Sequence, residues 1–141
     1  MCMEKYLKNK YVLGSAALMV ACIILALISG IGGNSPEGVV LKLERGINSG
    51  NDKKILSCYD SDLSKLYDMG EKLDKNVSLA DELGFGDRRV KLLVQSVTMD
   101  SDTEAAVSCI EILTEKGGKG ESVSLSSLKL NKEGGKWVIQ Y

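Results

Sequence analysis

The chain contains no histidine. Histidine is the commonest general base and metal ligand in proteins, and its charge changes near neutral pH. Its absence leaves acids and tyrosines as the main groups available for chemistry. We therefore predict no metal site and no cofactor, and we name no catalytic, cofactor-binding or metal-ligating residue.

Aromatic residues and excess positive charge are also scarce. One Trp, one Phe and five Tyr are spread along the chain, and the formal net charge is -1. Proteins that bind nucleic acid need a basic surface for the phosphates, and those that bind single strands stack the bases on aromatic side chains. The composition therefore predicts no nucleic-acid partner.

Charged residues are missing altogether from residues 11–31. At about 1.5 Å per residue, a helix of that length covers the roughly 30 Å hydrocarbon core of a bilayer. A cleaved signal peptide has a shorter apolar core, and only residues 28–30 resemble a cleavage site. Residues 19–21 before Cys22 loosely resemble a lipoprotein signal, but the chain stays apolar after that cysteine. A core helix of a soluble protein would show a polar face, and this segment has none. We therefore favour a transmembrane helix over all three alternatives.

The charges that flank this segment predict its orientation. Lys5, Lys8 and Lys10 precede it, and no cation follows it before Pro36. The positive-inside bias therefore places the N-terminus in the cytoplasm and the rest of the chain outside the cell membrane. The predicted organisation is a cytoplasmic tail (1–10), a single-pass transmembrane helix (11–31), a linker (32–35) and an extracytoplasmic domain (36–141).

Small residues recur within the predicted transmembrane helix. Cys22, Ala26 and Gly30 are four residues apart and fall on one helix face. Such faces allow helices to approach closely in lipid, so a weak homodimer through this segment is conceivable.

The first part of the predicted domain has helical periodicity. Residues 35–37 combine a hydroxyl N-cap, a proline and an acid, which together are typical of a helix start. Asp52 is predicted to be the N-cap of a short second helix. Residues 60–62 are predicted to separate that helix from a third one. A weaker pattern, through Leu73, Val77 and Ala80, continues the helical region towards residue 84. The apolar stripe of the first helix is Val39, Val40, Leu43 and Ile47.

After Gly86 the sequence becomes rich in Val, Leu, Ile, Ser and Thr. Four such runs are separated by turn residues, which predicts an antiparallel meander over 89–99, 104–115, 121–132 and 136–141. In the third run, Val123 and Leu125 occupy odd-numbered positions, whereas Leu128 and Leu130 occupy even-numbered ones. Apolar residues would therefore change from one face of the strand to the other, which predicts a β-bulge between them. Helices followed by strands indicate an α+β domain with two to three helices on a curved four-stranded sheet.

This order of elements resembles the nuclear-transport-factor-2-like (cystatin-like) superfamily. The resemblance rests on residues 47–52 (INSGND), which end a first helix and start a short one, and on the final strand at residues 135–141 (GKWVIQY). It is strongest for membrane-anchored bacterial members of unassigned function. It implies helices wrapped around a bent sheet to form a cone, often with a pocket. Some members are isomerases or dehydratases, and many are accessory or binding domains.

Three sets of side chains are candidate sites. Residues 60–71 place acids near calcium-loop positions, but Lys65 replaces the required glycine, so a capped helix is favoured. Cys58 and Cys109 could pair in an oxidising space or be two buried thiols. Glu111 lies between two isoleucines and could serve as a base, but the alternation favours an outward position.

The leading functional prediction is a non-enzymatic, membrane-tethered extracytoplasmic domain that binds a partner protein or a small ligand. One alternative is a small isomerase or dehydratase that uses acid and tyrosine groups, and another is a structural envelope component. A pocket of about 300 Å³ or more with convergent polar groups would favour a ligand or a substrate. A filled cone would favour a partner protein or a structural role.

Overall fold

The structure, a computed structural model, describes residues 34–73 and 78–141. The chain divides into two compact units, Met1–Gly32 and Gly33–Tyr141, and only the second is described below. The predicted tail, transmembrane helix and small-residue face fall on residues outside the described ranges. No helix within those ranges is both long and apolar enough to cross a membrane.

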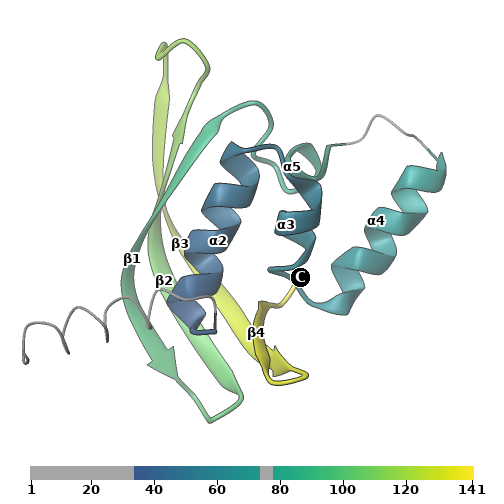
Figure 1. Cartoon of the computed structure of the whole chain (residues 1–141). Coiled ribbons are helices and arrows are strands. Elements are labelled where there is room, and N and C mark those ends of the chain that lie inside the picture. Colours follow the sequence, from purple (N-terminus) through teal and green to yellow (C-terminus); the bar gives the residue numbers. More distant parts are fainter. Residues whose placement is uncertain (1–33, 74–77) are drawn as a thin grey trace, which may run out of the picture. The chain divides into compact units, whose positions relative to one another are not determined.

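The described unit is an α+β domain, as predicted (Figure 1). Its helices come first and its strands follow in one block. The helices are α2 (Pro36–Asn48), α3 (Asp52–Leu56), α4 (Ser61–Leu73) and α5 (Leu79–Glu82). The strands are β1 (Arg89–Met99), β2 (Glu104–Thr114), β3 (Glu121–Glu133) and β4 (Lys136–Ile139).

Helix α2 begins and ends where its sequence predicts. The hydroxyl of Ser35 accepts a hydrogen bond from Gly38 N at 3.1 Å, with Pro36 as the first helical residue. Its predicted apolar stripe is buried, and the helix packs mainly on β1. The helix α3 can approach α2 closely because residue 46 is glycine: a Cβ there would lie 3.0 Å from Ile55 Cγ1.

The predicted cap of α3 is wrong by one residue. Asn51, not Asp52, is the N-cap, and its Oδ1 accepts from Lys54 N at 3.0 Å. Asp52 is the first helical residue and is therefore free to accept a hydrogen bond from the Tyr67 hydroxyl on α4, at 3.0 Å. The predicted continuation through Val77 crosses residues 74–77, which lie outside the described ranges, and α5 follows as a separate short helix.

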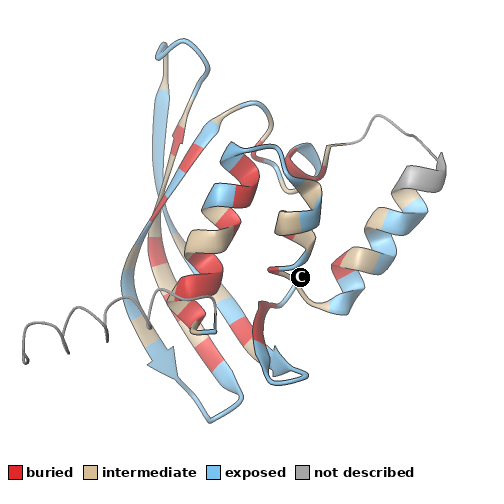
Figure 2. Ribbon diagram, in the orientation of Figure 1, coloured by how far each residue is buried: buried red, intermediate tan, exposed pale blue. Residues whose placement is uncertain are grey.

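The four strands form the predicted antiparallel meander, in the order β1-β2-β3-β4. One face, here called the inner face, carries the buried residues Val90, Val107 and Leu130 and packs against the helices. The opposite, outer face has no helix of the described unit on it. Figure 2 shows the buried residues gathered on α2 and on the strands behind it, whereas the distal part of the β2–β3 hairpin is exposed.

The bulge predicted in the third strand lies in the first strand instead. The register of β1 and β2 shifts between Val94 and Ser96, whereas β2 and β3 pair without interruption from Glu104 to Thr114. The parity change in β3 has a different cause. Leu128 and Leu130 lie on the inner face, and Val123 and Leu125 lie on the outer face, where they are exposed.

The core lies between the helices and the inner face. Trp137 is 5% exposed and belongs to the same core cluster as Val40, Leu43 and Ile47. Tyr141, the last residue of the predicted final strand, lies outside this cluster, because its side chain is 60% exposed. The chain leaves the sheet after Ile139, and Tyr141 turns towards α4 and the segment before it.

Candidate binding pocket

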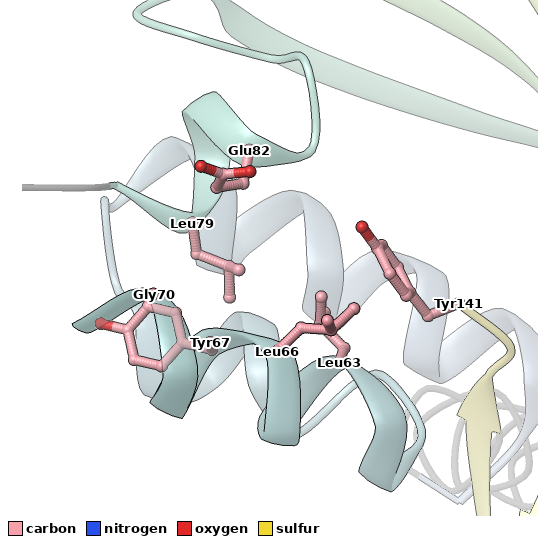
Figure 3. A pocket seen from close by; sticks show the side chains of 7 residues that line it. All are labelled: Leu63, Leu66, Tyr67, Gly70, Leu79, Glu82 and Tyr141. Carbon is pink, nitrogen blue, oxygen red and sulfur yellow. The ribbon is translucent and has the colours of Figure 1, made fainter. Parts of the chain in front are cut away.

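A partly enclosed cavity lies between α4, α5 and the C-terminus. It holds about 190 Å³. Figure 3 shows the side chains of Leu63, Leu66 and Leu79 pointing into one space, with Tyr141 closing one side and Glu82 at the edge. The complete lining is Leu63, Leu66, Tyr67, Gly70, Leu79, Glu82 and Tyr141.

Helical spacing places four of these residues on one face of α4. Leu63, Leu66, Tyr67 and Gly70 are three, four and seven residues apart, so they share a face. The hydrogen bond from the Tyr67 hydroxyl to Asp52 ties this face of α4 to α3. Residue 70 has no side chain, which leaves open space in that part of the wall.

Tyr141 is held at the pocket by two contacts. Its ring meets the ring of Tyr59 edge to face, with centroids 6.4 Å apart. Its backbone N–H donates to the carboxylate of Asp60 at 3.2 Å. Such aromatic pairs favour this geometry, and the contact positions the C-terminal ring although its outer side is exposed.

The pocket is suited to an apolar group next to a positive charge. Its walls are leucine and tyrosine side chains, and Glu82 is the only charged residue among them. An apolar cavity of about 150 Å³ is large enough for a benzene-sized molecule. The volume here therefore matches one large apolar side chain or one aromatic ring, and is below the roughly 300 Å³ of ordinary small-molecule sites.

Three further cavities are more open surface hollows of about 410, 230 and 500 Å³. The first of them contains Arg88, Arg89 and Lys116. The guanidinium of Arg88 donates to the carbonyls of Gly84 and Phe85, and Lys116 forms an exposed ion pair with Asp87 at 3.0 Å. Two of the three cations thus already have protein partners.

Glu111 lies on the inner face of the sheet, so the predicted outward position is wrong. It alternates with the buried residues Cys109 and Leu113, and its partner on β1 is the buried Leu92. Burial raises the pKa of the Tyr59 hydroxyl well above its usual value, and the charges of Cys58, Glu111 and Tyr141 raise it further.

The structure therefore brings an acid and a tyrosine within electrostatic reach of each other. Neither Glu111 nor Tyr59 lines any of the four cavities above, all of which are formed by described residues. The space between α2 and the sheet is filled by the core cluster.

Cys58 and Cys109 are free thiols, and both are fully buried. They therefore act as small apolar side chains, the second of the two predicted possibilities. Burial raises the pKa of each thiol. The candidate calcium loop lies in helix α4, which begins at Ser61, as the capped-helix alternative predicts. The described residues contain no group of three or more potential metal ligands.

Neither a protein-family model nor a curated protein matches the sequence. Solved structures do match. One is an NTF-2-like protein of unknown function from Shewanella oneidensis, with a TM-score of 0.55 and 15% identity over 72% of this chain and 88% of that one. The domain has a nuclear-transport-factor-2-like fold. A SEC-C motif containing protein from Rhodopseudomonas palustris matches with a TM-score of 0.55 and 14% identity over 75% of each chain.

The sequence could identify only part of this pocket. The third helix predicted after residues 60–62 is α4, and its residues Leu63, Leu66 and Tyr67 form one wall. Leu79 and Glu82 come from a separate short helix, and Tyr141 from the end of the chain. No spacing in the sequence connects these three residues with α4, because only the tertiary fold brings them together.

Proposed function

We propose that the protein is a membrane-tethered extracytoplasmic binding domain that accepts one apolar side chain of a partner protein in the pocket between α4 and α5. The observation that carries this proposal is the pocket itself: an apolar space of about 190 Å³ with a single carboxylate, Glu82, at its edge. The leucine walls favour an apolar group by burial, and the carboxylate favours a cation next to it.

The exposure of the lining supports a binding surface over a structural one. Leu66 is 45% exposed on the α4 side, and Tyr141 is exposed at the opposite side. Large apolar side chains gathered around a hollow are typical of a place where a partner docks. The membrane tether is also part of this proposal, and it is inferred from the sequence of residues 1–31 alone.

The alternative of a small isomerase or dehydratase has one observation in its favour: Glu111 is near enough to Tyr59 to help raise the pKa of its hydroxyl. A substrate needs space next to the acid, and the core cluster fills the inner face. A binding role therefore fits the described residues better. If Glu111→Gln abolished a measured turnover while leaving the fold intact, the enzymatic alternative would replace the binding proposal.

The test uses two matched ring compounds, benzylammonium and benzoate, added to the isotope-labelled domain and followed by NMR. We expect benzylammonium to shift the amide signals of α4, α5 and the C-terminus at millimolar concentration, and benzoate to bind more weakly. Glu82→Gln should remove the difference between the two compounds, because the carboxylate is the charge that distinguishes them.

A pocket-filling variant provides the second arm. A side chain at residue 70 has open space around it, and Gly70 has no unusual backbone angle, so Gly70→Leu should fill the pocket without strain. Gly70→Ala is the matched control that leaves most of the volume free. Binding that survives Gly70→Leu, or shifts that map elsewhere, would contradict the proposal.

A further inference from the structure

The outer face of the sheet carries a group of neighbouring apolar side chains, here called the outer patch. They come from three adjacent strands and occupy two adjacent rows of the sheet register: Leu93, Ile110, Ile112, Val123 and Leu125. Leu125 is 81% exposed and Val123 is 66% exposed. No helix of the described unit lies on this face, and contiguous exposed apolar side chains of this kind mark an interaction surface.

Two opposite charges border the outer patch at one end. The next row of the register consists of Arg89 on β1, Thr114 on β2 and Glu121 on β3. Both charged residues are exposed, and within residues 34–73 and 78–141 neither forms an ion pair. The row therefore presents a cation on one side and an anion on the other, and each can pair with a second molecule.

We propose that the outer patch packs face to face against the outer patch of a second copy of the chain, with a two-fold axis that runs along β2. Such an axis places β1 of each copy over β3 of the other, and β2 over itself. Each register row then faces the same row of the other copy. Leu93 faces Leu125. Ile110 and Ile112 each face their own counterparts, so apolar side chains meet apolar side chains.

The bordering charges indicate that the occupant is a second copy. In the same arrangement Arg89 of each copy faces Glu121 of the other, because the two residues occupy one row on the strands that the axis exchanges. The symmetry therefore forms two ion pairs at once. Complementary charges of this kind fix the register of an interface and disfavour other partners.

A two-fold axis across the strands fits the outer face less well. Centred on the row of Ile110, it would place Ile112 opposite Ser108 and Val123 opposite Ser127, so apolar side chains would face hydroxyls. An axis along the strands avoids this mismatch. It also keeps the two sheets evenly spaced, because β1 and the β3 above it turn away from β2 by the same angle in the twisted sheets.

Cross-linking of the full-length chain in lipid vesicles tests the position of the axis. Ile110→Cys is introduced after Cys2→Ser and Cys22→Ala have removed the other thiols, apart from the buried Cys58 and Cys109. We expect a short bismaleimide to join two copies through residue 110, since that residue faces its counterpart. Lys53→Cys, in the helix α3, is the matched control and should give only the background of random collisions.

Charge variants in the Ile110→Cys chain test the register. Arg89→Glu or Glu121→Arg alone turns two attractive contacts into two repulsive ones, so each should lower the cross-linking rate about tenfold at low salt. The double variant Arg89→Glu/Glu121→Arg should restore the rate. Lys129→Glu, on the outer face two rows beyond Leu125, should change little. Thermal melting checks that every variant remains folded.

Three outcomes would overturn the proposal. Cross-linking at residue 110 that does not exceed that at residue 53 would show that the outer faces do not meet. A rate that does not respond to Arg89→Glu or Glu121→Arg would assign association to another part of the chain. An effect of Lys129→Glu as large as that of Glu121→Arg would indicate the axis across the strands, in which those two residues face each other.

Discussion

Asn48 forms two hydrogen bonds with the backbone of Val90 in the edge strand β1. Its Nδ2 donates to the carbonyl oxygen at 2.7 Å, and its Oδ1 accepts from the N–H at 2.8 Å. One side chain thereby supplies the donor and the acceptor that a neighbouring strand would supply. It also joins the end of α2 to the start of the sheet.

Replacing this side chain should destabilise the domain. Asn48→Ala leaves the part-buried donor and acceptor of Val90 without a partner, which typically costs about 1–3 kcal/mol. Urea denaturation of residues 34–141 measures this loss. The neighbouring variant Ser49→Ala removes only exposed or helix-end hydrogen bonds and should cost less than about 1 kcal/mol. Equal effects of the two variants would contradict the proposed role of Asn48.

The last strand should be essential for folding. Trp137 is buried in the core, so Trp137→Ala should cost about 3–5 kcal/mol of the roughly 5–15 kcal/mol that a domain possesses. A fragment of residues 34–135 should lose more, because β3 and the segment at Cys58 lose their hydrogen-bond partners in β4. Circular dichroism and thermal melting of both proteins provide the measurement. A sharp transition in the fragment at the temperature of the intact domain would show that β4 is dispensable.

Stability should fall in alkaline solution. Burial raises the pKa of the Cys58 and Cys109 thiols above the 9.0 of an ordinary thiol. Above about pH 9 the unfolded chain releases these protons while the folded chain keeps them, so unfolding becomes easier as the pH rises towards the folded pKa. Each thiol lowers the free energy of unfolding by at most about 1.4 kcal/mol per pH unit.

Urea denaturation between pH 7 and pH 10.5 checks this slope. The double variant Cys58→Ala/Cys109→Ala is the control, and we expect its free energy of unfolding to decrease less steeply above pH 9 than that of the natural sequence. The same slope in both proteins would assign the alkaline loss to other groups.

The membrane topology can be tested on intact cells. If residues 11–31 span the membrane with Lys5, Lys8 and Lys10 inside, external protease should digest the C-terminal domain and spare an N-terminal tag. Immunoblotting against tags at both ends distinguishes the fragments. A domain that is protected until the cells are lysed would reverse the orientation and remove the extracytoplasmic part of the proposed function.

The sequence by itself determined the starts of α2 and α4 and the positions of the four strands. The Ser35-Pro36 start of α2 and the turn residues between strands act over a few residues, so they can be recognised without knowing the tertiary contacts. The four strand positions follow from the same local signals, and they agree with the structure to within one or two residues at each end.

Only the tertiary structure decided which face of each strand is covered. The isoleucines Ile110 and Ile112 predicted that their side of β2 faces the core. In the structure, α2 packs over the opposite side, which carries Val107, Cys109 and Glu111. Alternation shows that two faces differ, but the position of the helices determines which one is inner. The pocket also depends on the tertiary structure, because Tyr141, at the end of the chain, closes one side of a space lined by α4 and α5.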